Sequence, residues 1–147
     1  MSGKTGASDQ CTCGLATRGR LDAYNEEAFW YLLRVERRRS ERSRRPFLLV
    51  LVVLKNDAGA EVRMHPSFVD KLFSGLSRVL RETDVIGWYR EEQIVGALLS
   101  GQGDGPWTEF SARITERLTD ALSQTLPAPM SGRVQVRAYQ IQPTLAH

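Results

Sequence analysis

The residues best suited to chemistry lie between Arg81 and Ile94, where two polar groups flank a short apolar run. In the first group, Arg81-Glu-Thr-Asp84, a guanidinium and a carboxylate stand three positions apart. The second group is Arg90-Glu91-Glu92-Gln93-Ile94, and five residues separate it from the first. Arg81 and Asp84 offer complementary hydrogen-bonding groups to a ligand, but these residue types also serve at a helix C-terminus and in a turn without any ligand. Both interpretations stay open at this point.

A β-hairpin is expected to position the two groups. Val85, Ile86 and Trp88 form one apolar run and Ile94–Leu99 forms another, with the charged residues 90–93 between them. Two such runs around a short polar segment are typical of antiparallel strands joined by a tight turn. The second polar group would form the tip of this hairpin, and the first would stand where the chain enters it.

A long helix is predicted ahead of the hairpin, over residues 21–44. Apolar side chains recur near one face, Asp22 or Asn25 can cap the start, and Pro46 prevents continuation. The segment Phe29–Leu33 holds more large apolar side chains than one narrow stripe requires. Packing on the helix's own domain explains the excess, and contact with a second copy of the chain would explain it as well.

After this helix the pattern predicts strand, helix, strand, strand, helix, strand within residues 46–142. The run Phe47–Leu54 is continuously apolar, as expected of a strand inside a sheet, whereas residues 133–142 alternate and should have one wet face. Amphipathic helices are expected from Pro66 and over about residues 107–126. This order predicts an α+β sandwich with a ferredoxin-like βαββαβ core, both of its helices on one face and the leading helix elsewhere.

Composition favours a single domain. A chain of 147 residues that is 41% hydrophobic can bury one ordinary core. We therefore expect a disordered leader over residues 1–19 and one domain over residues 20–147. The N-terminus lacks the apolar stretch of a signal peptide and no apolar run is long enough to span a bilayer, so a cytoplasmic location is expected. Cys11 and Cys13 fall in the leader and make a poor metal site, because His65 and His147 are the only histidines.

The hairpin and its flanks resemble the GGDEF domain of diguanylate cyclases. In that family a helix ends in Arg-x-x-Asp, a strand follows, and a Gly-Gly-Asp/Glu-Glu-Phe turn carries the chemistry. Here Arg81 and Asp84 take the first positions, and residues 90–94 stand where the signature turn belongs. The opening Arg45-Pro46-Phe47 of the first core strand and the order of elements over residues 21–142 match as well. The resemblance implies a nucleotidyl cyclase-like fold, in a reduced form.

The same resemblance implies that the chain is not an enzyme. In active members the first strand ends in Asp-x-Asp, and its first aspartate binds the metal that bridges the GTP phosphates. Val53 takes that position and Lys55 replaces the second aspartate, and a valine cannot coordinate a divalent cation. The two signature glycines, which let the backbone approach the substrate, are Arg90 and Glu91, and only Glu92 suits its acidic position. We therefore expect neither phosphoryl transfer nor a metal cofactor.

The resemblance still implies an inhibitory site, although it implies no catalysis. In the family, Arg-x-x-Asp binds the product, cyclic di-GMP, and this role passes to Arg81 and Asp84. The guanidinium would donate to guanine O6 and N7, worth about 1–3 kcal/mol, and the carboxylate would accept from the opposite edge of the base. The leading expectation is an inactive regulatory domain that binds cyclic di-GMP. Its Asp-Val-Ile-Gly-Trp-Tyr segment also resembles small GGDEF-like proteins associated with bacterial exopolysaccharide production, which implies control of that pathway.

Two alternatives of other classes stay open. An adaptor of the same fold would form a homodimer through the leading helix and bind a protein of a signalling or polysaccharide pathway without nucleotide. Seven arginines between Arg34 and Arg45 make one end of that helix strongly cationic. They could supply charge for the dinucleotide phosphates or attract nucleic acid. Nucleic acid is the weakest expectation, because neither interleaved aromatic residues nor a groove-reading motif accompanies the arginines.

Overall fold

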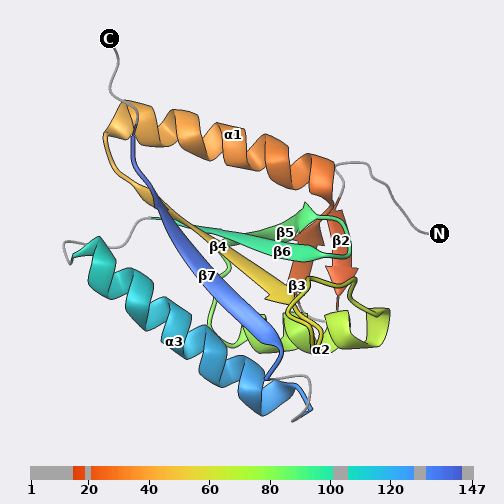
Figure 1. Ribbon diagram of the computed structural model, residues 1–147. Coiled ribbons are helices and arrows are strands. Elements are labelled where there is room, and N and C mark those ends of the chain that lie inside the picture. The colour runs from red at the N-terminus through yellow and green to blue at the C-terminus, as the bar shows by residue number, and fades with distance from the viewer. Residues whose placement is uncertain (1–14, 19–20, 101–105, 128–131, 144–147) are drawn as a thin grey trace.

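A six-stranded sheet with helices on both faces forms the described part of the chain, which comprises residues 15–18, 21–100, 106–127 and 132–143 of the computed structural model (Figure 1). The strand order is β2-β3-β5-β6-β4-β7. The strands are β2 (Leu15–Arg18), β3 (Leu21–Tyr24), β4 (Phe47–Leu54), β5 (Val85–Arg90), β6 (Ile94–Leu99) and β7 (Val134–Ile141). The helices are α1 (Glu26–Ser43), α2 (Pro66–Ser77) and α3 (Trp107–Thr125).

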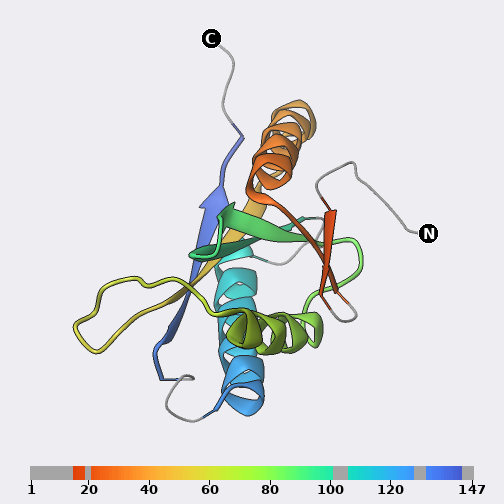
Figure 2. The same cartoon turned by 90° about the vertical axis from the view of Figure 1, so that its right-hand side faces the viewer.

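The predicted ferredoxin-like core is confirmed. Its four strands lie in the order β5-β6-β4-β7, and each neighbouring pair is antiparallel. Helices α2 and α3 cover one face of the sheet, and α1 crosses the other face (Figures 1 and 2). Strand β4 therefore lies inside the sheet and is covered on both sides. This explains its continuous apolar run, since Leu48, Val50 and Val52 join the core under α2 and α3 while Phe47 and Leu49 join the core under α1.

The prediction of one helix over residues 21–44 was wrong at its start. Leu21–Tyr24 forms the strand β3, and the helix begins only at Glu26. The side chain of Asn25 caps it by accepting from the Ala28 N–H at 2.9 Å, so the residues before the cap are free to extend. Ala23 is fully buried, and Tyr24 pairs with Gly87 of β5. The chain gains a sheet neighbour there, which outweighs helical periodicity.

The leader was also predicted too long. Leu15–Arg18 forms β2, which pairs antiparallel with β3 at the sheet edge. A hairpin partner satisfies the outer backbone groups of β3, so these four residues have a structural use that their composition does not signal. The predictions for Cys11 and Cys13 lie outside the described residues. None of the described helices combines the length and the apolarity needed to cross a membrane.

Two glycines set the distance between α1 and the sheet. Gly87 and Gly96 are paired on β5 and β6, and the fully buried Phe29 ring of α1 lies against them. A Cβ at Gly96 would stand 2.7 Å from Phe29 Cζ, and one at Gly87 would stand 2.6 Å from the Tyr24 carbonyl oxygen. Only hydrogen fits at either place, so the helix can approach the strands closely.

Candidate functional site

The tip of the β5–β6 hairpin is the turn that the sequence predicts. The Gln93 N–H donates to the Arg90 carbonyl at 3.0 Å, and a register shift between Trp88 and Arg90 marks a bulge just before the turn. Glu92 has a φ of 63°, in the left-handed region that favours glycine. The hairpin therefore keeps a turn of glycine-like geometry although no glycine occupies it.

Helix α1 closes one side of this turn. The Glu91 N–H donates to Glu26 Oε1 at 2.6 Å, and the Glu26 N–H donates to Glu91 Oε1 at 3.2 Å, so the two residues bond each other reciprocally. Next to them, Trp30 Nε1 donates to the Tyr89 carbonyl at 2.9 Å, and the two rings lie 4.7 Å apart. The Glu91 N–H of the turn is thus bonded to the Glu26 carboxylate, and the Glu91 carboxylate lies beside it.

The connection between β4 and α2 holds the other side of the turn. The Met64 N–H donates to the Glu92 carbonyl at 2.7 Å, and Arg63 Nη2 lies 2.5 Å from Glu92 Oε1. This ion pair is exposed at both ends and contributes little by itself. The turn is therefore contacted by the β4–α2 connection on one side and by α1 on the other.

Val53, which the resemblance to GGDEF domains places at their metal-ligand position, lies directly beside the turn. Val53 of β4 pairs with Ile94 of β6, and Val53 is only 3% exposed. Two apolar side chains therefore lie at this place, and neither offers an oxygen ligand. Over the described ranges, no group of three or more histidine, cysteine, aspartate or glutamate residues could hold a metal ion.

Arg81 and Asp84 form a turn of their own between α2 and β5. The Arg81 N–H donates to Asp84 Oδ2 at 2.8 Å, and the Asp84 N–H donates back to the Arg81 carbonyl at 3.0 Å. Arg81 Nη2 lies 3.4 Å from Asp84 Oδ1 and donates to the Ser100 carbonyl at 3.0 Å. The Asp84 side chain is 4% exposed and the Arg81 side chain is 51% exposed. The carboxylate is therefore used inside the protein, whereas much of the guanidinium faces solvent.

The two predicted groups are not brought together. Arg81 and Asp84 lie at the open end of the β5–β6 hairpin, and Arg90–Ile94 lies at its tip. Strand β5 has six residues, so the separation is about 20 Å at roughly 3.3 Å per residue. The chain thus has two separate polar sites. The hairpin tip is bonded to α1 and to the β4–α2 connection, whereas the Arg81–Asp84 turn has a half-exposed guanidinium.

Sequence reasoning missed the partners that close the tip. Glu26 is expected at the first turn of a helix because it complements the helix dipole, and this role gives no hint of a second bond to Glu91. Arg63 lies in a polar connection without periodicity. Only the three-dimensional path of α1 and of this connection brings both residues to the turn. Trp30 carried a usable signal, since a tryptophan with a polar N–H at a helix start commonly has a partner.

Comparison with known proteins bears on the fold. No protein-family model matches the sequence, and no curated protein matches it. Among solved structures, the chain is similar to the GGDEF domain of TpbB, also called YfiN, from Pseudomonas aeruginosa, with a TM-score of 0.60 and 15% identity over 80% of this chain and 71% of that one. It is also similar to the diguanylate cyclase SiaD of Pseudomonas aeruginosa, solved in complex with its activator SiaC, with a TM-score of 0.55 and 19% identity; 84% of this chain matches, but only 49% of SiaD is covered. The chain therefore has the fold of a diguanylate cyclase GGDEF domain.

Proposed function

We propose that this protein is a catalytically inactive, GGDEF-like regulatory domain. The observation that supports this most directly is the reciprocal bonding of Glu26 and Glu91, which places two carboxylates at the turn where a GGDEF domain would receive a triphosphate. Like charges repel, so a triphosphate would have to displace these bonds and tolerate both carboxylates. Val53 at the metal position removes the cation that would offset this repulsion.

A GTP turnover assay with magnesium and with manganese tests this proposal. We expect no cyclic di-GMP from the natural protein under conditions in which an active cyclase, run in parallel, converts its substrate. The variant Arg90→Gly/Glu91→Gly should also be inactive, because glycines restore room for the backbone but Val53 still offers no oxygen ligand. Product formed by the natural protein would refute the proposal.

We propose in addition that the domain binds cyclic di-GMP through Arg81. The partly exposed guanidinium supports this, since it can turn its remaining donors toward O6 and N7 of a guanine. Asp84 would first have to give up its bond to the Arg81 N–H before it could accept from a base. We assign such a receptor to the control of exopolysaccharide production, because the sequence of residues 84–89 resembles that of small GGDEF-like proteins associated with this process.

Isothermal titration with cyclic di-GMP tests this ligand. We expect saturable binding that Arg81→Ala weakens by at least about tenfold. Arg78→Ala is the matched control, because Arg78 is an exposed arginine at the end of α2 whose side chain makes no ion pair among the described residues. Equal affinity of the Arg81→Ala variant and the control would show that Arg81 is not the binding residue.

A nucleotide-independent adaptor remains the second candidate, and the outer face of α1 favours it. Tyr31 is 58% exposed there, with the Arg34 guanidinium 6.0 Å from the ring centroid. An exposed aromatic beside a cation suits a protein contact, and a homodimer through α1 is its simplest form. Sedimentation should then give a dimer that Tyr31→Glu converts to a monomer. If the natural protein stays monomeric at high concentration, the proposed homodimer through α1 is refuted.

A further inference from the structure

The second half of α1 and the residues that follow it carry most of the positive charge of the chain. Seven arginines lie between Arg34 and Arg45, and all seven are exposed. Glu41 is the one exposed carboxylate within this segment. The whole chain has a formal net charge of only +3. The positive charge is therefore concentrated on one helix rather than spread over the surface.

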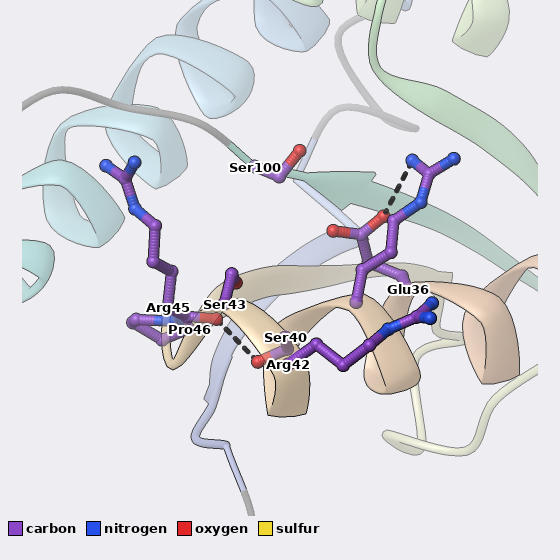
Figure 3. Close-up of a pocket in the computed structure, with 8 residues that line it drawn as sticks. Glu36, Ser40, Arg42, Ser43, Arg45, Pro46 and Ser100 are labelled. Atoms are coloured by element: carbon purple, nitrogen blue, oxygen red, sulfur yellow. Dashed lines mark hydrogen bonds and ion pairs between the residues drawn. The ribbon is translucent and has the colours of Figure 1, made fainter.

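The protein itself neutralises little of this charge. Glu36 is half-buried and lies 4.0 Å from Arg39, on the flank of the helix (Figure 3). No other arginine of the segment forms an ion pair among the described residues. Arg34 instead lies near an aromatic ring, with its guanidinium 6.0 Å from the centroid of Tyr31. A surface with so many uncompensated cations attracts an anionic partner.

Four of the exposed side chains form a straight row along the helix. They are Tyr31, Arg34, Arg38 and Arg42. Steps of three and four residues place them on one face, and the buried side chains of α1, such as Phe29, lie on the opposite face. The row is about 16 Å long at a rise of 1.5 Å per residue. Helix α1 lies at one extremity of the molecule, across the sheet from α2 and α3 (Figures 1 and 2), so the row faces away from the rest of the protein.

We propose that this row binds the surface of an anionic phospholipid membrane, with α1 lying flat on the headgroups. Clusters of four to eight arginines or lysines on one helix face are typical of binding to anionic lipids. Tyr31 adds an amphipathic ring of the kind that favours the membrane–water interface. The apolar side chains of α1 are buried against the sheet and cannot enter the bilayer. The binding is therefore electrostatic, and salt should weaken it.

The shape of the row favours a membrane over a nucleic acid. A straight row on a raised helix can touch a flat charged surface along its whole length, whereas a helical phosphate backbone curves away from it. Proteins that bind single strands also offer several aromatic rings on which bases stack. Tyr31 is the one aromatic side chain in the row. The inference does not rest on the proposed function, because neither Arg81 nor the hairpin tip belongs to the row.

Co-sedimentation with lipid vesicles tests this inference. We expect the natural protein to bind phosphatidylcholine vesicles that contain about 30% phosphatidylserine, and not vesicles of phosphatidylcholine alone. Raising the salt from about 0.15 M to about 0.5 M should abolish the binding. Arg34→Gln/Arg38→Gln should lower the affinity by about tenfold or more, since one arginine close to an anionic surface contributes roughly fivefold.

A matched control separates the row from net charge. Arg113→Gln/Arg117→Gln removes the same charge from two exposed positions on α3, across the sheet from α1. Its affinity for the vesicles should stay within about twofold of that of the natural protein at physiological salt. Unchanged thermal unfolding of both double variants shows that each one is folded.

The remaining outcomes would overturn the inference. They are no binding to either kind of vesicle, equal binding to both kinds, and an equal loss of affinity in the two double variants. Vesicle binding that tolerates Arg34→Gln/Arg38→Gln, together with a tenfold loss of affinity for a DNA duplex in that variant, would assign the row to nucleic acid instead. Titration of the natural protein with cyclic di-GMP can succeed or fail independently of these results, so the two proposals are tested separately.

Discussion

The Phe29 ring packs directly against the paired glycines Gly87 and Gly96, so the effect of a substitution there on the free energy of unfolding can be worked out from the distances. In Gly96→Ala the new Cβ would stand 2.7 Å from Phe29 Cζ and 2.9 Å from Phe29 Cε2. Ordinary contacts between carbon atoms begin near 3.5 Å, and the Phe29 ring is fully buried, so it cannot turn away into solvent. The helix α1 must therefore move outward or the ring must leave its rotamer.

The expected loss of unfolding free energy follows from two opposing effects. Overpacking of a core costs about 1–3 kcal/mol, whereas replacing glycine lowers the entropy of the unfolded chain and returns about 0.4–1 kcal/mol. We expect a net loss of about 1–2 kcal/mol for Gly96→Ala, which lowers the melting temperature by on the order of 5 °C. Urea unfolding and calorimetry measure both quantities. Gly132→Ala is the control, because nothing lies within 4 Å of its added Cβ, and its change should stay below about 0.5 kcal/mol.

A second substitution identifies the cause. Phe29→Leu alone should destabilise the protein by emptying part of the core, but combined with Gly96→Ala it should cost less than the sum of the two changes. A favourable coupling of about 1 kcal/mol or more is expected for residues in direct contact. Strict additivity, or a Gly96→Ala variant as stable as the natural protein, would mean that the glycine pair does not set the position of α1.

Three further predictions concern the two polar groups. Glu26→Ala should speed hydrogen exchange of the Glu91 amide by roughly tenfold in NMR measurements, since that amide loses a charged acceptor. Asp84→Ala should lower the free energy of unfolding by about 1–2 kcal/mol because it removes a buried carboxylate that accepts from the Arg81 N–H, whereas Arg81→Ala should cost less than about 1 kcal/mol because its side chain is half exposed. Arg63→Ala should change stability by less than about 0.5 kcal/mol in urea titrations, as expected of an exposed pair.

The core of the fold could be predicted because each of its elements carries a local signal. Pro66 opens α2, the continuous run Phe47–Leu54 marks a covered strand, and the polar residues 91–93 mark a turn between two apolar runs. The order of these elements then leaves few topologies. The start of α1 was predicted too early, because Leu21–Tyr24 is compatible with either a helix or a strand. It forms a strand because it pairs with β5, which is distant in sequence.

The places of the two polar groups on the hairpin could be predicted from the sequence, but their contacts could not. The spacing of Arg81, Asp84 and residues 90–94 identified both ends of the hairpin. It did not reveal that Asp84 is almost fully buried, since burial at this turn depends on how the chain folds back toward Ser100.

Three positions at and beside the hairpin tip have contacts of their own within the fold. Glu91 bonds Glu26, Glu92 pairs with Arg63, and Val53 lies opposite Ile94. Replacing Glu91 by glycine would remove the bond from the Glu26 N–H and leave the other contacts in place. The hairpin tip is therefore a structural joint between α1 and the connection after β4. Ligand-binding capacity is then to be sought at the other end of the hairpin, where the Arg81 side chain is half exposed.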